Sequence, residues 1–300
     1  MKDKIIVYCG GGAMSGVFGA GVLKGLYDRG LLEKVESIYG GSAGVLNASY
    51  LLSGQVGLGS KIYWEDLQKD FIYPRNIIWG TLDLFVNRFF KKIDSKDIHN
   101  VVNINHLVNI MSFVKPLDIN KLATSSINLF VKVLDINSGD LKYINFKDYP
   151  SMDLLKASVA IKPHFFEEVL INENVYIDGT IKESIGLDYL LKTYPNHKLV
   201  LIINEPIRRG IRHYFKNIIE AIVSSLYPYR ISLFKIFLEK EKLIRNDIGK
   251  ALLNDKVLLI HPDFPKRALP RTVDSHILRN TFDVGYKEVD KILDFINKDN

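Results

Sequence analysis

The sequence predicts an α/β protein in which helices connect the parallel strands of a central sheet. Two observations support this fold class. A short apolar segment, a group of glycines and a helix-spaced segment follow one another twice within residues 5–52, an order typical of parallel strands joined by crossover helices. The chain has 300 residues, 47% of them apolar and 25% charged, which is typical of a globular protein and enough for a large core.

The elements follow from apolar spacing and from turn residues. The first unit consists of a strand at 5–9, glycines at 10–12 and a helix at 17–28, and the second of a strand at 35–39, glycines at 40–41 and a helix at 43–52. Residues 60–115 predict a mostly helical insertion. The remaining elements are strands at 127–135 and 141–146 joined as a hairpin, a helix at 152–160, a strand at 175–177, a helix at 186–194, a strand at 199–203, a broken helical region at 213–245, a strand at 257–260 and a helix at 282–296.

No shift in composition marks a domain boundary. We therefore expect one domain over residues 1–300, with a motif-bearing core at about 5–205 and a C-terminal extension of helices and a strand at about 206–300.

Composition and charge exclude several classes of protein. The single cysteine, Cys9, cannot form a disulfide framework or a multi-cysteine metal site. The net charge of +6 comes from 40 Lys and Arg against 34 Asp and Glu, and since no zinc-finger or RNA-binding motif accompanies it, we expect no nucleic-acid partner. No signal-peptide core and no run of about 18 apolar residues occurs, so we expect no transmembrane helix and a cytoplasmic location.

The sharpest local motif is a G-x-S-x-G sequence at residues 40–44, between a predicted strand and a predicted helix. A serine on such a tight turn has an exposed hydroxyl, and the free N–H groups of the helix start point at charge that develops beside it. This context favours Ser42 as a nucleophile. The alternative is a glycine-rich turn in which Ser42 is only the N-cap of the helix.

A second glycine-rich loop, at residues 10–16, also lies between a strand and a helix. Its backbone N–H groups are suited to an oxyanion hole or to a phosphate, and its alternative role is a tight packing turn. The dinucleotide fingerprint G-x-G-x-x-G is not met, because Ser15 and Ala13 stand where it needs glycine, and no Gly-Lys-Ser/Thr sequence follows for a P-loop. The serine turn downstream favours the oxyanion hole.

A serine nucleophile needs a proton acceptor. Asp178, followed by Gly179 and Thr180, comes directly after an apolar strand, at the sheet edge where open parallel sheets place their sites. Taken alone, an Asp-Gly pair is more often a β-turn. The seven histidines offer no clear base, with the partial exception of His261 after the strand at 257–260. They are His99, His106, His164, His197, His213, His261 and His276.

Together, the loop, the serine turn and the Asp-Gly pair resemble the patatin-like phospholipases. That family has a glycine-rich loop near the N-terminus, a G-x-S-x-G turn soon after it and a D-G-[A/G] motif much later. Neighbouring sequence at 20–23, 45–48 and 156–163 is also similar, and the resemblance covers about residues 5–205.

The resemblance implies a three-layer α/β/α fold and a Ser–Asp dyad, with Ser42 as nucleophile and Asp178 as general base. It implies hydrolysis of a phospholipid or other lipid ester through an acyl-serine, at a peripheral membrane surface and without a metal or cofactor. The implied oxyanion donors are the amides of Gly10, Gly11, Gly12 and Ala43, and the implied motif glycines are Gly16, Gly40, Gly44 and Gly179.

Three positions depart from the family pattern. The loop of the family usually reads G-G-G-x-[K/R]-G, whereas Ala13 and Ser15 stand here where a glycine and a basic residue are common. Thr180 stands where the family has glycine or alanine, and we expect its branched side chain to crowd the turn. Gly186 stands near a common proline.

These departures keep two alternatives open, a general carboxylesterase or thioesterase of the same fold and a catalytically impaired lipid-binding module. Aromatic segments at 71–90, followed by Lys91 and Lys92, and at 214–237 are candidates for lipid access, and core packing is their alternative role.

Overall fold

The computed structural model describes residues 4–90, 99–207, 211–227, 229 and 231–298. Among these residues, eight strands form one sheet in the order β5-β6-β3-β2-β1-β7-β8, with β4 paired to β3. The strands are β1 (Ile5–Cys9), β2 (Val35–Gly40), β3 (Asn128–Asp135), β4 (Leu141–Asn145), β5 (Val169–Ile171), β6 (Asn174–Asp178), β7 (Lys198–Ile202) and β8 (Val257–Ile260). The five neighbouring strands β3, β2, β1, β7 and β8 are parallel. β4 and β6 each pair antiparallel with β3, and β5 pairs antiparallel with β6.

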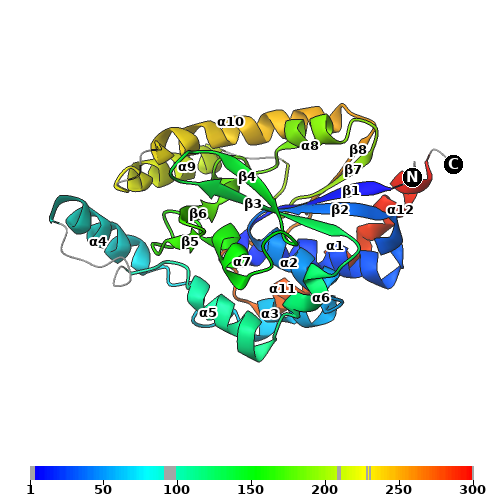
Figure 1. Cartoon of the computed structure of the whole chain (residues 1–300), viewed down its shortest axis with the longest axis horizontal. Coiled ribbons are helices and arrows are strands. Elements are labelled where there is room, and N and C mark those ends of the chain that lie inside the picture. Colours follow the sequence, from blue (N-terminus) through cyan, green and yellow to red (C-terminus); the bar gives the residue numbers. More distant parts are fainter. Residues whose placement is uncertain (1–3, 91–98, 208–210, 228, 230, 299–300) are drawn as a thin grey trace.

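Helices cover both faces of the sheet, so the protein has three layers (Figure 1). The helices are α1 (Val17–Asp28), α2 (Ala43–Leu52), α3 (Val56–Glu65), α4 (Asn76–Phe90), α5 (Ile104–Asn109), α6 (Ile119–Ala123), α7 (Met152–Val159), α8 (Leu187–Thr193), α9 (Ile211–Ser224), α10 (Leu233–Leu252), α11 (Ser275–Lys287) and α12 (Val289–Asn297). Shorter helical turns are η1 (Ala13–Gly16), η2 (Leu31–Lys34), η3 (Ile110–Val114) and η4 (Gly179–Ile181).

Alternation along β1 explains how one sheet supports two cores. Ile5 and Val7 point into a core shared with α1, α2, α11 and α12, whereas Ile6 and Tyr8 point into a core shared with α8 and α10. Successive side chains of a strand lie on opposite faces, so a fully buried strand must be apolar throughout. All five residues of β1 are buried.

Most expected elements are confirmed, including both strand–turn–helix units, the hairpin of β3 and β4, and the break between α9 and α10. The expected helix at 282–296 is wrong in its bounds, because Asp274 caps a helix that starts earlier and a second helix follows from Val289. The short β5 and α6 were not expected.

The C-terminal third of the chain contributes a strand to the sheet and helices to the layer that contains α1. β8 pairs with β7, and α11 packs on α1 so closely that a Cβ atom at Gly21 would lie 2.1 Å from Phe282 O. The sequence had no signal for this contact, because a small residue within a helix does not show which helix it meets.

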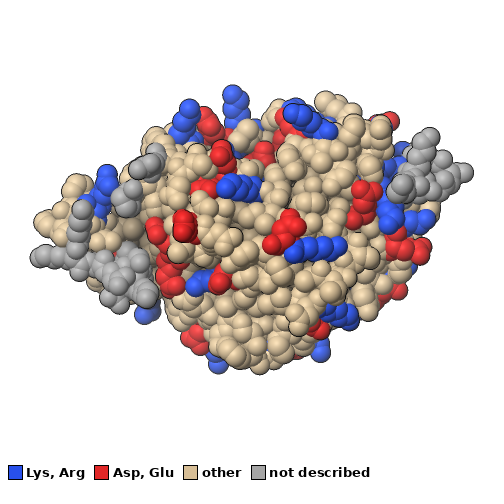
Figure 2. Space-filling model, in the orientation of Figure 1, with Lys and Arg blue, Asp and Glu red and all other residues tan. Residues whose placement is uncertain are grey.

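Helix α4 projects from the body (Figure 1) and exposes a series of apolar side chains. Those with 48–67% of their surface exposed are Ile78, Trp79, Leu82, Phe85, Phe89 and Phe90. Lys91 and Lys92 lie outside the described residues. Charges of both signs are mixed over the face seen in Figure 2. No helix in the described ranges is long and apolar enough to cross a bilayer.

Candidate active site

The register of β3 explains how Ser42 and Asp178, far apart in the chain, come together. Gly40, the last residue of β2, lies opposite Val131, and Asp178, the last residue of β6, lies opposite Val133. Since β4 occupies one edge of β3 over the same residues, β2 and β6 must share the other edge. They run toward each other along it, so their carboxyl ends meet, and the turn that carries Ser42 begins at this point.

Ser42 is at the first position before α2, with φ 55° and ψ −133°. A non-glycine residue in this region is strained by roughly 1–3 kcal/mol. The side chain makes no capping hydrogen bond to the helix, so the alternative role of Ser42 as a side-chain N-cap is not realised. Instead, Ser42 lines a cavity.

The glycines around Ser42 are required by close packing. A Cβ atom at Gly44 would lie 2.1 Å from Cys9 O, and one at Gly40 would lie 2.9 Å from Val45 Cα. Only residues without a side chain let the turn pass this close to β1 and to its own helix.

Asp178 is fully buried, and its two carboxylate oxygens are in different environments. Oδ1 accepts hydrogen bonds from Thr180 N at 2.9 Å and from Thr180 Oγ1 at 2.7 Å. Within the described chain, Oδ2 has no hydrogen-bond partner.

Burial raises the pKa of the Asp178 carboxyl, and the Thr180 hydrogen bonds oppose this effect. The Ser42 hydroxyl and the Lys240 charge lower the same pKa further. The serine is therefore close enough to interact with the carboxylate.

The first glycine loop lies directly against Ser42. A Cβ atom at Gly11 would be 2.7 Å from Ser42 Cβ, so the backbone of the loop touches the serine. Asn204, just after β7, donates from Nδ2 to Gly10 O at 2.7 Å and to Gly11 O at 3.0 Å. In a trans peptide the N–H points away from the C=O, so these bonds turn the Gly11 and Gly12 N–H groups away from Asn204.

The structure corrects one of the expected oxyanion donors. The amide of Gly10 donates to Ile202 O at 2.8 Å as a continuation of the sheet, and it is not available to a substrate. Gly11, Gly12 and Ala43 all line the cavity.

The departures in the loop have a local explanation. Ser15, in place of the usual basic residue, donates from Oγ to Gly12 O at 2.8 Å and closes a short helical turn. Ala13 takes a left-handed φ of 48°. A Cβ atom at Gly16 would be 2.8 Å from Ala43 Cβ, so this glycine lets the loop pack against the serine turn.

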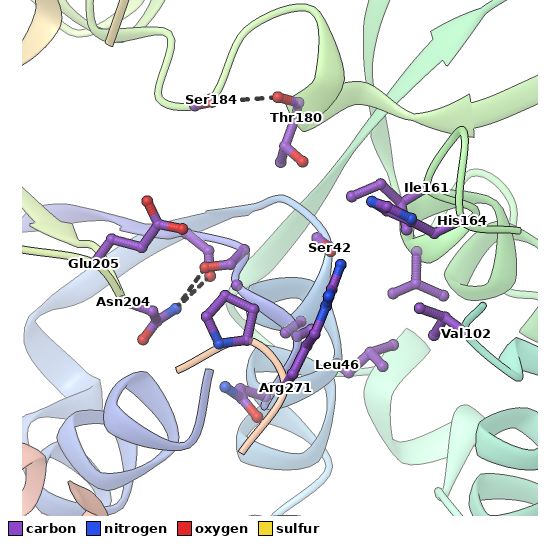
Figure 3. A pocket seen from close by; sticks show the side chains of 18 of the residues that line it. Ser42, Leu46, Val102, Ile161, His164, Thr180, Ser184, Asn204, Glu205 and Arg271 are labelled. Carbon is purple, nitrogen blue, oxygen red and sulfur yellow. Dashed lines mark hydrogen bonds between the residues drawn. The ribbon is translucent and has the colours of Figure 1, made fainter. Parts of the chain in front are cut away.

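The cavity has a volume of about 230 Å³ and a lining that contains both apolar and ionisable side chains. The apolar part of the lining includes Leu46, Ile62, Leu67, Phe71, Val102, Leu107 and Met111. The ionisable side chains in the lining are those of His164, Glu205, Lys216, Glu220, Lys240 and Arg271. In Figure 3 the Arg271 side chain extends toward Ser42, with Thr180 on the opposite side of the serine.

His164 is the histidine that sequence reasoning passed over. It lines the cavity, and its Nε2 lies 3.1 Å from Glu220 Oε1. The same carboxylate oxygen lies 3.6 Å from Lys216 Nζ. Burial raises the pKa of Glu220, but the His164 hydrogen bond and the nearby lysines outweigh it and lower the pKa to about 2. Nothing in the local sequence links residues this far apart.

His261 does not line the cavity, and the side chain of His213 lies outside the described residues. Within the described ranges, no group of three or more His, Cys, Asp or Glu side chains is arranged to hold a metal ion.

The fold and the cavity define an α/β protein in which a serine turn and a buried carboxylate meet where β2 and β6 end beside β3. The family model described as "Patatin-like phospholipase" matches residues 7–191, more than half of the chain. The chain therefore belongs to the patatin-like phospholipase family, a class of enzymes that hydrolyse lipid esters. The three-layer α/β/α fold expected from the resemblance is confirmed.

Two solved structures are similar in part. VipD from Legionella pneumophila has a TM-score of 0.48 and 16% identity, over 98% of this chain and 67% of that chain. The complex of SpcU with ExoU from the type III secretion system of Pseudomonas aeruginosa has a TM-score of 0.29 and 12% identity, over 82% of this chain and 52% of the matched one. No curated protein sequence matches the chain.

Proposed function

We propose that the chain is a serine lipid acyl hydrolase of the phospholipase A or lysophospholipase type, with Ser42 as nucleophile and Asp178 as general base. The observation that carries the proposal is the pairing at the strand ends. A strained, cavity-lining serine interacts with a buried carboxylate whose Oδ2 has no hydrogen-bond partner in the described chain.

The reaction follows from this arrangement. The Ser42 Oγ attacks the ester carbonyl carbon while its proton passes to Asp178, and the N–H groups of Gly11, Gly12 and Ala43 hold the oxyanion. The intermediate expels the glycerol oxygen, which takes the proton from Asp178 and leaves an acyl group on Ser42. Asp178 then deprotonates a water molecule that attacks this acyl carbon. The bond from the acyl carbon to the Ser42 Oγ breaks, the Oγ takes the proton back from Asp178, and the fatty acid leaves.

Burial of Asp178 suits it to the role of a base. A carboxylate in a low-dielectric site binds a proton more tightly than one in water, because the ionised form is less well solvated. A raised pKa brings the base closer to neutral pH, where general-base catalysis is more effective.

The mixed lining of the cavity favours a phospholipid over a small neutral ester. Its apolar side chains are suited to an acyl chain, and Ser42 lines the same cavity. The cationic groups of Arg271, Lys216 and Lys240 are suited to the phosphate of a headgroup.

A chain-length series of esters tests the function. Wild type, Ser42→Ala and Asp178→Asn are compared on short and long acyl chains. Ser49→Ala is the control, because the Ser49 hydroxyl is buried in α2, the helix that follows Ser42, and donates to Val45 O. We expect both site variants to lose activity by at least about a thousandfold while the control keeps it. Full activity in Ser42→Ala would remove the serine from the mechanism.

We further propose that the protein is cytoplasmic and attaches to membranes through the outer sides of α4 and α9. Helix α9 places Lys216 and Glu220 in the cavity wall, whereas Ile219 and Ile222 are 61% and 56% exposed. Leu84 of α4 and Ala221 of α9 belong to the same buried apolar cluster. A lipid ester can then enter the cavity without crossing water.

Vesicle sedimentation tests this attachment. Phe85→Ser and Phe89→Ser in α4 are expected to lower the fraction bound to phosphatidylcholine–phosphatidylglycerol vesicles, while hydrolysis of a water-soluble ester is unchanged. Leu253→Ser is the control, because Leu253 is 91% exposed just beyond the end of α10. Equal binding by all variants would count against a membrane role for α4.

A further inference from the structure

Thr180 stands where the family has glycine or alanine, and its branched side chain was expected to crowd the turn. The structure shows two specific contacts instead. The hydroxyl donates to Asp178 Oδ1 at 2.7 Å, and a Cβ atom at Gly41 would lie 2.3 Å from Thr180 Cγ2, so the methyl group packs against the backbone of the serine turn.

These two contacts connect the base to the nucleophile. Both hydrogen bonds from Thr180 end on Oδ1, which fixes the rotation of the carboxylate and leaves Oδ2 as the oxygen available to Ser42. The methyl group packs against Gly41, the residue before Ser42. A glycine or alanine at position 180 can supply the backbone N–H bond, but neither the hydroxyl bond nor the full methyl contact.

We infer that Thr180 is a positioning residue of this site, which holds the Asp178 carboxylate in the rotation that serves Ser42. The inference rests on the proposed Ser–Asp mechanism and adds a residue to it. Thr180 itself makes no bond to the reacting atoms, and it acts through Asp178.

The hydroxyl also favours the ionised form of Asp178, because a hydrogen bond to a carboxylate stabilises its charge. The other groups that face this carboxylate are Lys240 from α10, Lys132 from β3 and Tyr8 from β1. Removing the Thr180 hydroxyl leaves all three in place, so a change in the pH profile can be assigned to Thr180.

The test compares Thr180→Val, which keeps the shape and loses the hydroxyl, with Thr180→Ser, which keeps the hydroxyl. For Thr180→Val we expect kcat to fall roughly ten- to hundredfold and the acid limb of the kcat/KM profile to move up by about one pH unit. Thr180→Ser should restore most of the rate and the original limb. Thr281→Val is the matched control, since Thr281 has a buried hydroxyl that bonds to Ala268 N.

Each outcome decides the inference. A wild-type rate and pH profile in Thr180→Val, with Ser42→Ala and Asp178→Asn inactive, would overturn the role of Thr180 and leave the proposed function intact. Activity retained in Ser42→Ala or Asp178→Asn would remove both. If Thr180→Val does not fold by circular dichroism, Thr180→Ala, which has the residue common in the family, takes its place with the same expected shift.

Discussion

Asn204 offers the most informative perturbation of the oxyanion loop, because it holds two loop carbonyls at once. The side chain is buried and makes three hydrogen bonds, two as donor to Gly10 O and Gly11 O and one as acceptor from Gly19 N at 2.9 Å. Asn204→Asp keeps the size and the acceptor. It replaces both donor hydrogens with an oxygen that faces the two carbonyls.

The magnitude follows from these bonds. Each buried carbonyl that loses its donor costs about 1–3 kcal/mol, so two of them favour rotation of a loop peptide by roughly 2–6 kcal/mol. Rotation would turn one N–H out of the oxyanion hole, and losing one such donor lowers kcat by about 10²–10³-fold. The negative charge of the new carboxylate near the oxyanion adds to the loss.

The assay is steady-state hydrolysis of a short soluble ester, with Asn204→Ala as a second variant. We expect kcat to fall by about 10²-fold or more in both variants while KM changes little, because the loop holds the transition state rather than the ground state. Asn145→Asp, in β4 and away from the cavity, is the control. A kcat within about threefold of wild type in a folded Asn204→Asp protein would refute this role of Asn204.

Three further predictions address the site. Burial raises the pKa of Asp178, so the ionised carboxylate destabilises the folded state as pH rises above the pKa of about 3.9 in the unfolded chain. Asp178→Asn should therefore be inactive but match or exceed the Tm of wild type at pH 7. A lower Tm would contradict this reasoning. Gly44→Ala places a methyl group against Cys9 O and should lower the free energy of unfolding, measured in urea, by about 1–3 kcal/mol or more. An unchanged midpoint of urea unfolding would show that the turn can relax. Arg271→Gln should lower kcat/KM for a phospholipid about tenfold and leave kcat/KM for a short neutral ester unchanged. Arg267→Gln, outside the cavity, should change neither value. Equal losses on both substrates would argue against phosphate recognition by Arg271.

Local sequence predicted those parts of the fold that depend on local physics. Glycines at positions 10–12 and at positions 40, 41 and 44 interrupt apolar runs at strand–helix turns, and both turns are found where they were expected. The meeting of Ser42 with Asp178 was expected only from the family resemblance. They meet because β2 and β6 pair with the same side of β3, each with a particular register. No single segment of the sequence determines that pairing.

The missed features are long-range contacts. Asn204 supports the loop across the chain, and a single asparagine after a strand gives no signal of that role. Gly10 was wrongly included among the oxyanion donors, because its amide continues the pairing of β1 with β7. Arg271 reaches the cavity on a segment that is docked by a hydrogen bond from Met14 N to Pro270 O at 3.4 Å.

The central claim is that Ser42 carries the acyl group during turnover, and mass spectrometry of a rapidly quenched reaction tests it most directly. With a long-chain phospholipid, we expect the peptide that contains Ser42 to gain the mass of one fatty acyl group, and Ser42→Ala to show no such adduct. An acyl group on a different residue, or efficient turnover without any acylated peptide, would contradict the account.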